Sequence, residues 1–233
     1  MKILIVAATS TEVSRSFKSA IINEDDTGKI VNFRFGQLDL TLLITGPGMV
    51  PTAFLMGRVL AAEKFDLAID LGIAGSFNEE ISIGETVHII SDLLAEAGAD
   101  SADGFIPLYS MKMARPYKPD FSGNDGLIMN TSYPKLASVT SLRTVSAVTV
   151  NTISGCEKQI EMMKARTQAD VESMEGAAFF YACMMHQLPC LQVRTVSNYI
   201  APRDKARWNI GNAVENLALH VNRILEELNQ QAP

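Results

Sequence analysis

The chain has 233 residues, of which 47% are hydrophobic and 20% charged, and its formal net charge is -6. The length fits one domain, residues 1–233, with enough chain to bury a sizeable core, and the composition excludes a disordered protein. An acidic chain without a basic run also argues against a nucleic-acid partner.

The three cysteines and three histidines show no CxxC or HxxxH spacing and form no Cys/His cluster. This scatter predicts reduced thiols in a cytoplasmic protein and no metal site. The apolar run from Ile3 to Ala8 is shorter than the hydrophobic region of a signal peptide and is typical of a buried first strand. No apolar stretch reaches the length of a membrane span, so we expect no membrane partner.

Short β-branched runs alternate with helical segments along the chain. The predicted strands are Lys2–Ala8, Ile30–Phe35, Leu40–Thr45, Leu67–Leu71, Thr86–Ser91, Val145–Val150 and Cys190–Ser197. The predicted helices are Pro51–Glu63, Glu157–Arg166, Glu175–His186 and Arg207–Leu228. This alternation predicts an α/β fold around a central sheet that is mixed or mostly parallel.

One connection is unusually long. Residues 96–133 are rich in Gly, Asp, Ser and Pro, and a loop of this length in a compact domain is typical of a lid, an insertion or a mobile segment. We therefore expect a loop-rich segment here and treat it as a candidate active-site cover.

Five polar or glycine-containing stretches follow predicted strands: Thr9–Glu12, Thr45–Gly48, Gly72–Ser76, Met174–Glu175 and Ser197–Asn198. In open α/β sheets, ligands bind beyond the carboxyl ends of the strands, so these stretches are expected to converge on one site. Each has an ordinary structural explanation when taken alone. Glu12 and Glu175 suit the first turn of a helix, Asn198 suits a turn, and neither glycine pair matches a nucleotide-binding fingerprint.

The motifs MKILIVAATSTEV, TGPGM, GIAGSF, VESMEGAA and VRTVSN occur in that order. Together they resemble the nucleoside phosphorylase/nucleosidase superfamily over nearly the whole chain. Within it the chain resembles hydrolases of the 5′-methylthioadenosine nucleosidase type, and most of all the futalosine hydrolases of an alternative menaquinone pathway. The resemblance implies a three-layer α/β/α domain with a central mixed sheet, no metal or organic cofactor, a small purine nucleoside as substrate, and a homo-oligomer, a dimer or larger.

The same resemblance assigns roles to residues that match the family motifs. Glu12, soon after the first strand, is expected to orient the attacking water. Met174 is expected to pack on the ribose while Glu175 binds its hydroxyl groups. Ala74 and Gly75, in the glycine turn expected after the LAIDL strand, correspond to backbone contacts with the base and sugar.

The residues expected beside the base differ from those of the adenine-specific enzymes. Backbone groups beside the base map onto Thr152 and Ile153, and the aromatic residue that stacks on adenine at the Thr152 position is missing. Adenine-cleaving enzymes carry Ser-Asp where this chain has Ser197-Asn198, the pair found in 6-oxopurine phosphorylases. An amide can donate to O6 or N7 where an ionised Asp would face lone pairs, so the expected leaving base is hypoxanthine, and less so guanine.

The first loop favours hydrolysis over phosphorolysis. The phosphorylases hold phosphate there with glycine and arginine, whereas this chain has an acid at Glu12 and places Arg15 inside the predicted helix. The alternatives that stay open are a methylthioadenosine/adenosylhomocysteine nucleosidase, a purine nucleoside phosphorylase, and a non-catalytic nucleoside-binding protein. Glu172 receives no catalytic role because Ser173 takes the place of the first Glu in the family motif. Phe105 is expected to cover the 5′ side of the nucleoside.

Overall fold

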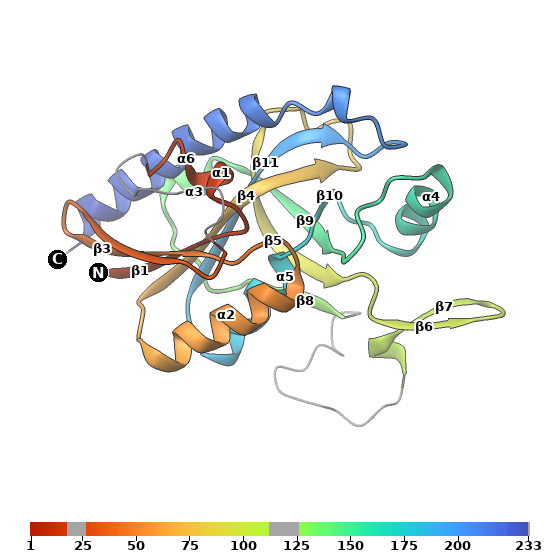
Figure 1. Cartoon of the computed structure of the whole chain (residues 1–233), viewed down its shortest axis with the longest axis horizontal. Helices are drawn as coiled ribbons and strands as arrows, with labels where there is room; N and C mark the ends of the chain where they lie inside the picture. Colours follow the sequence, from red (N-terminus) through yellow and green to blue (C-terminus); the bar gives the residue numbers. More distant parts are fainter. Residues whose placement is uncertain (18–26, 112–125, 233) are drawn as a thin grey trace.

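A mixed β-sheet forms the centre of the protein in a computed structural model that describes residues 1–17, 27–111 and 126–232 (Figure 1). Its hydrogen-bonded order is β10-β9-β5-β11-β4-β1-β3-β2, and β8 pairs with β5. The strands are β1 (Lys2–Ala7), β2 (Ile30–Phe35), β3 (Leu38–Ile44), β4 (Leu67–Ser76), β5 (Thr86–Leu94), β8 (Leu127–Met129), β9 (Arg143–Thr149), β10 (Val171–Ser173) and β11 (Cys190–Tyr199). A separate hairpin consists of β6 (Gly98–Ser101) and β7 (Gly104–Pro107).

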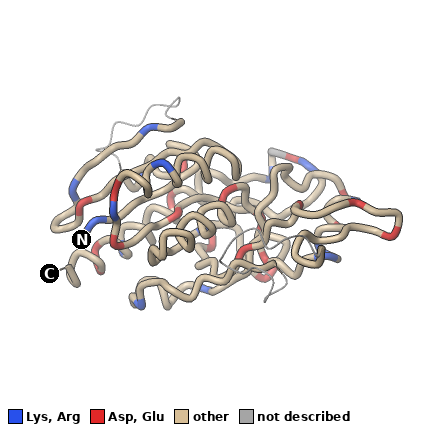
Figure 2. The backbone as a smooth tube through the Cα atoms, turned by 90° about the horizontal axis from the view of Figure 1, so that it is seen from below, with Lys and Arg blue, Asp and Glu red and all other residues tan. Residues whose placement is uncertain are grey.

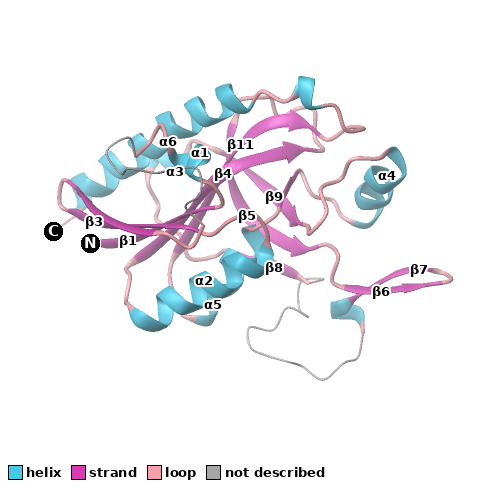
Figure 3. Cartoon of the chain, in the orientation of Figure 1, coloured by secondary structure: helices cyan, strands magenta, loops and turns pink. Residues whose placement is uncertain are grey.

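Helices lie on both sides of the sheet (Figure 3). They are α1 (Ser10–Val13), α2 (Met49–Ala62), α3 (Ala137–Thr140), α4 (Glu157–Arg166), α5 (Gly176–Met185) and α6 (Ile210–Gln231), with 3-10 turns η1 (Leu108–Ser110) and η3 (Lys205–Arg207). One face of the sheet packs on α2 and α5, and the other packs on α6. The α/β/α architecture with a mixed sheet, expected from the resemblance, is confirmed.

Alternation along the strands explains the three layers. In β4, Ala68 belongs to the core under α2 and α5, whereas Ile69 belongs to the core under α6, because successive strand residues point to opposite faces. Both faces of the central strands are therefore apolar, as expected for strands covered on both sides.

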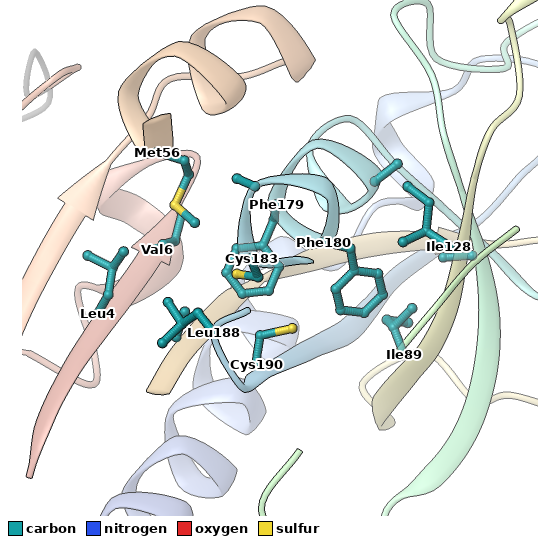
Figure 4. Close-up of a cluster of buried hydrophobic side chains, with 14 of the residues drawn as sticks. Leu4, Val6, Met56, Ile89, Ile128, Phe179, Phe180, Cys183, Leu188 and Cys190 are labelled. Carbon is teal, nitrogen blue, oxygen red and sulfur yellow. The ribbon is translucent and has the colours of Figure 1, made fainter. Parts of the chain in front are cut away.

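Helices α5 and α6 bury different proportions of their surface. Helix α5 is apolar nearly all round, and its Phe179 and Phe180 are fully buried in the core shown in Figure 4. A fully buried aromatic side chain contributes about 1.5–3 kcal/mol to folding. Helix α6 instead turns one apolar stripe to the sheet, which includes Leu217, Val221 and Ile224.

The three residues of β10 close part of the sheet into a ring. This strand pairs with β9 in parallel and with β4 in antiparallel, while β9, β5, β11 and β4 are already joined in sequence. In this arrangement Glu172 lies opposite Val148 on one side and Gly75 on the other. An open sheet would have left β9 far from β4.

The seven predicted strands are all present, and the four predicted helices differ from the observed ones only at their ends. The expectation of a turn at Gly72–Ser76 was wrong. Strand β4 continues through these residues because β11 and β10 pair with this part of it, whereas β1 pairs only with its first residues. The short strands β6, β7, β8 and β10 were not predicted, since three or four residues are too few to show a period.

The segment 96–133 is less loop-rich than expected. Its described part contains β6, β7, η1 and β8, and residues 112–125 lie outside the described residues. The hairpin β6–β7 projects from the body of the protein beside α4 (Figure 1). Phe105 lies on this hairpin with its ring 4.4 Å from the Arg166 guanidinium at the end of α4, so one face of the ring is already covered.

Within the described part of the chain, none of the helices combines the length and the apolar composition that crossing a membrane requires.

Candidate active site

The five stretches that were expected to converge do meet in the structure. The Gly48 N–H donates to Glu175 Oε1 at 2.8 Å, and the Ile73 N–H donates to Glu12 Oε1 at 3.1 Å. On the adjoining strand Asn198 pairs with Gly75. Residues far apart in the sequence thus surround one point at the carboxyl ends of β1, β4 and β10.

Glu12 is held rigidly at the start of α1. Its Oε2 accepts hydrogen bonds from the Thr9 N–H and the Thr9 hydroxyl, both at 2.9 Å. Burial raises the pKa of Glu12, and the nearby Arg194 and these hydrogen bonds only partly offset that effect. Helix α1 ends at Val13, so the expectation that Arg15 lies inside the helix was wrong.

Met174 and Glu175 lie at the junction between β10 and α5. Glu175 is buried, and besides Gly48 it accepts a hydrogen bond from the Met174 N–H at 3.2 Å. Burial raises its pKa to about 7, despite the opposing charge of Arg194. The N–H of Gly48 is therefore used within the protein and is not available to a ligand. Met174 itself is half-buried, which leaves part of its side chain open to the site.

Arg194 on β11 is the functional candidate that the sequence analysis missed. Its Nη2 donates to Asp70 Oδ2 at 2.5 Å, and both side chains are buried, each with only 2% of its surface exposed. Its Nε and Nη1 atoms have no hydrogen-bond partner among the described residues. Burial opposes the guanidinium charge, but the carboxylates of Asp70, Glu175 and Glu12 outweigh it and raise the pKa of Arg194. A lone arginine inside an apolar strand was the only available signal.

Gly72 explains how Glu12 and Arg194 come so close to β4. A Cβ atom at this position would lie 2.7 Å from Glu12 Oε1 and 3.0 Å from Arg194 Nη1. Only glycine leaves room for both groups against the strand. The glycine is needed for close approach rather than for a turn.

Asn198 lies within β11, which continues to Tyr199 beyond the predicted end of the strand at Ser197. The register between β11 and β4 shifts between Val196 and Asn198, so Ser197 is an extra residue in a β-bulge. The Ser197 hydroxyl lies 2.8 Å from Asn198 Oδ1, to which it donates, and 3.2 Å from the carbonyl of Ala74. Asn198 Nδ2 donates to the carbonyl of Tyr199 at 3.1 Å. An amide nitrogen carries two hydrogens, so the second is available for a ligand.

Ala74 and Gly75, two of the expected base-contacting residues, pair with β11 on either side of this bulge. Ala74 is buried and Gly75 is half-buried, and a Cβ on Gly75 would lie 2.8 Å from Ile200 Cγ1. The other two, Thr152 and Ile153, are exposed on the loop that follows β9. The Thr152 N–H donates to Glu96 at 3.3 Å, which leaves its carbonyl and side chain for a ligand.

Asp92 is a further buried carboxyl that was not identified from the sequence. It supports the start of α5, next to Glu175. The Thr149 hydroxyl donates to Asp92 Oδ1 at 2.8 Å and accepts from the Ala177 N–H at 2.8 Å. Burial raises the pKa of Asp92 to about 7. This chain of bonds fixes the first turn of α5 on the sheet and therefore the position of Glu175.

The charge of the site suits a neutral ligand. Glu12, Glu175 and Asp70 surround the single guanidinium of Arg194, so an added anion would face more negative than positive groups. Elsewhere in the described residues, Lys and Arg are interspersed with Asp and Glu along the fold (Figure 2). Among these residues no group of three or more His, Cys, Asp or Glu side chains is arranged to hold a metal ion.

Comparison with known proteins places the chain in a family. The sequence profile of the phosphorylase superfamily matches residues 2–228. The futalosine hydrolase of Streptomyces coelicolor is 28% identical over 240 residues, which cover 100% of this chain and 99% of that protein. The futalosine hydrolase of Thermus thermophilus is 30% identical over 188 residues, which cover 79% of this chain and 80% of that protein.

A solved structure shows the same fold. The futalosine hydrolase of Helicobacter pylori superposes with a TM-score of 0.76 at 15% identity, over 97% of this chain and 98% of that one. The chain belongs to the phosphorylase superfamily and, within it, to the futalosine hydrolase family.

Proposed function

We propose that this protein hydrolyses the N-glycosidic bond of futalosine, releasing hypoxanthine and the dehypoxanthine sugar product that continues toward menaquinone. The observation that carries the proposal is the convergence of Glu12, Glu175 and Asn198, which supply a water site, a ribose site and a base site side by side. The two relatives described above are named for the same activity.

Glu175 has the hydrogen-bonding capacity that a ribose requires. A carboxylate offers about four lone-pair positions, and two of them accept the N–H groups of Gly48 and Met174. The two that remain match the 2′- and 3′-hydroxyl groups, which both donate. Met174, half-buried beside it, packs against the sugar.

Glu12 is suited to activate water on the opposite face of the sugar. Three donors occupy its oxygens, which leaves about one lone-pair position for a proton of the attacking water. A raised pKa makes this carboxylate a stronger base than an exposed glutamate. As water attacks C1′, the transition state resembles an oxocarbenium ion, and Glu12 takes the proton that the water loses.

Asn198 promotes departure of the base. Its free amide hydrogen donates to O6 or N7 of hypoxanthine as negative charge builds on the ring, and the Ser197 hydroxyl fixes the amide orientation. Ala74, Gly75, Thr152 and Ile153 contact the base and sugar around it. This arrangement disfavours an adenine nucleosidase, for which an amide donor at N6 would be mismatched.

Hydrolysis is favoured over phosphorolysis by electrostatics. A phosphate bound at the position of the nucleophile would lie against Glu12 and near Glu175, with only Arg194 to compensate. Water carries no charge and avoids that repulsion. The whole activity resides in a single domain of a cytoplasmic homo-oligomer, a dimer or larger, with neither nucleic acid nor membrane as partner.

The test is base release measured chromatographically from futalosine, inosine and methylthioadenosine, each with and without phosphate. We expect futalosine to be the best substrate, with a rate that phosphate does not change and a free sugar as the second product. Asn198→Asp should lower activity on both hypoxanthine nucleosides relative to methylthioadenosine. Preference of the unmodified protein for methylthioadenosine, dependence on phosphate, or saturable binding without base release would each refute the proposal.

A further inference from the structure

Glu172 is buried in β10 and holds one residue of the loop after β9. Its Oε1 accepts the Ser154 N–H at 2.9 Å, and its Oε2 accepts the Ser154 hydroxyl at 2.5 Å. Both side chains are buried, Glu172 to 4% exposure and Ser154 to 8%. A buried carboxylate that accepts two convergent donors from one residue is a specific and rigid contact.

Ser154 is the buried point of an otherwise accessible loop. Asn151, Thr152 and Ile153 just before it are exposed, as is Cys156 just after it. The loop is also tied at its two ends. Glu96 accepts the Asn151 N–H at 2.6 Å, and the Gly155 carbonyl accepts the Arg203 N–H at 3.0 Å. Without the bond to Glu172, the middle of the loop would have no anchor to the sheet among the described residues.

The strand that carries Glu172 adjoins the base site. Through the ring closed by β10, Glu172 pairs with Gly75, and Gly75 pairs on its other side with Asn198. The anchor of the loop and the residue that binds the leaving base are therefore fixed to the same strand, β4. A shift of the loop would change its distance from Asn198 directly.

We propose that Glu172 is a positioning residue that, by holding Ser154, sets the distance between Thr152–Ile153 and Asn198 and thereby fits the base site to a 6-oxopurine. The proposal rests on the proposed function, which places the purine between these groups. It also separates the two glutamates of VESMEGAA. Glu175 touches the sugar, whereas Glu172 acts only through the loop.

A positioning role predicts a distinctive response to substitution. Glutamine at position 172 can accept the Ser154 N–H with its oxygen and donate its amide to the Ser154 hydroxyl, so Glu172→Gln preserves both contacts. Alanine removes both. A proton-transferring carboxylate would show the opposite pattern, because Gln and Ala abolish that chemistry equally.

The experiment measures kcat and KM for futalosine and the Kd of free hypoxanthine. For Glu172→Ala we expect KM and Kd to rise about tenfold or more, with kcat changed much less, because lost contacts to the bound base weaken ground-state binding. Glu172→Gln should stay within about threefold of the unmodified protein, since it keeps two hydrogen bonds. Ser154→Ala, which loses the hydroxyl alone, should fall between them and provides the test if Glu172→Ala does not fold.

A matched control exists on the other side of the sheet. Glu227 on α6 also holds a serine N–H and hydroxyl, those of Ser138 at 2.8 and 2.6 Å, but both at Oε2 and at a half-buried position outside the site, while its Oε1 accepts the Ala137 N–H at 2.7 Å. Glu227→Ala should therefore leave KM, Kd and kcat unchanged. The positioning role is refuted if Glu172→Ala and Ser154→Ala behave like Glu227→Ala, if Glu172→Gln raises KM and Kd as much as Glu172→Ala does, or if both Glu172 variants lose kcat by about 10²-fold or more. Absence of base release by the unmodified protein would instead refute the proposed function.

Discussion

Glu12 and Glu175 are both buried carboxyls beside Arg194, yet their hydrogen bonds suit them to different tasks. Glu12 accepts three donors and has little capacity left, enough for one water proton. Glu175 accepts two and keeps room for a diol. The number of free acceptor positions therefore supports the proposal that Glu12 binds the water and Glu175 the sugar.

Replacing Glu12 by glutamine tests this assignment. A positioned general base contributes about 10²–10⁴-fold to the rate, so Glu12→Gln should lower kcat by that factor. The Kd of hypoxanthine should stay nearly unchanged, because the proposed base site is at Asn198 rather than at Glu12. The measurement is steady-state kinetics on futalosine together with calorimetric binding of hypoxanthine. Turnover equal to that of the unmodified protein would remove Glu12 from the mechanism.

At the residue scale, a candidate site residue can be recognised in the sequence when it stands in a motif. A residue whose role depends on burial cannot. Glu12, Glu175 and Asn198 follow predicted strands and could be proposed as site residues from the sequence. Arg194 and Asp92 lie inside strands, where a charged residue carries no positional signal until its partners are known. Each pairing joins neighbouring strands whose paired residues lie 124 and 57 positions apart in the sequence, so no local pattern encodes it.

Among the elements, α5 begins in close contact with the sheet. A Cβ atom on Gly176, its first residue, would overlap Gln192 Nε2 and Asp92 Oδ2. Gly57, within α2, has no atom within 4 Å of the corresponding position. These two helical glycines therefore have different reasons to be present, one steric and one without a visible packing role.

Gly→Ala substitutions at the two positions should change stability in opposite directions. Gly57→Ala should stabilise the protein by about 1 kcal/mol, because alanine favours a helix interior. Gly176→Ala should destabilise it by about 1–3 kcal/mol through overpacking, and should lower activity because it displaces Glu175. Urea unfolding followed by circular dichroism measures both. Equal effects of the two substitutions would contradict the close contact between α5 and the sheet.

The elements that were predicted well are those with enough residues to show a period. Strand β2 was predicted at its observed ends, as was α4, while β6, β7, β8 and β10 were too short to be seen. The bulge at Ser197 could not be anticipated, because it depends on the register between β11 and β4. A glycine pair in GIAGSF suggested a turn, but in this fold the glycines make room for Glu12 and Ile200.

For the molecule as a whole, the buried carboxyls predict an unusual dependence of stability on pH. The pKa of Glu175 is about 7 when folded, against 4.5 for an ordinary glutamate. Between these values the folded protein binds a proton that the unfolded chain has released, so this contribution favours folding at low pH. It is lost as the pH rises from 4.5 to about 7, a loss of about 3 kcal/mol. Asp92, with a pKa of about 7, acts in the same direction.

Urea unfolding at pH 5 and pH 8 tests this prediction. Glu175→Gln should reduce the difference in unfolding free energy between the two pH values by about 3 kcal/mol, since it cannot ionise. Glu227→Gln is the control, because the pH dependence of stability that Glu227 contributes has the opposite sign. Hydrogen bonds from Ser138 and Ala137 lower the pKa of Glu227, so its stabilising effect is present at neutral pH and lost on acidification. An unchanged pH difference in Glu175→Gln would contradict the raised pKa.

The ring closed by β10 also bears on how the protein reaches its native state. Val171–Ser173 must meet residues near 75, almost a hundred positions earlier, before the ring exists, and β11 must follow before Asn198 has its partner. Contacts of such long sequence separation form slowly, because the chain entropy lost in closing them is not recovered until they are complete. A ribosome-bound chain that ends before Tyr199 therefore lacks the ring and the base site, and catalytic competence arises only late in synthesis.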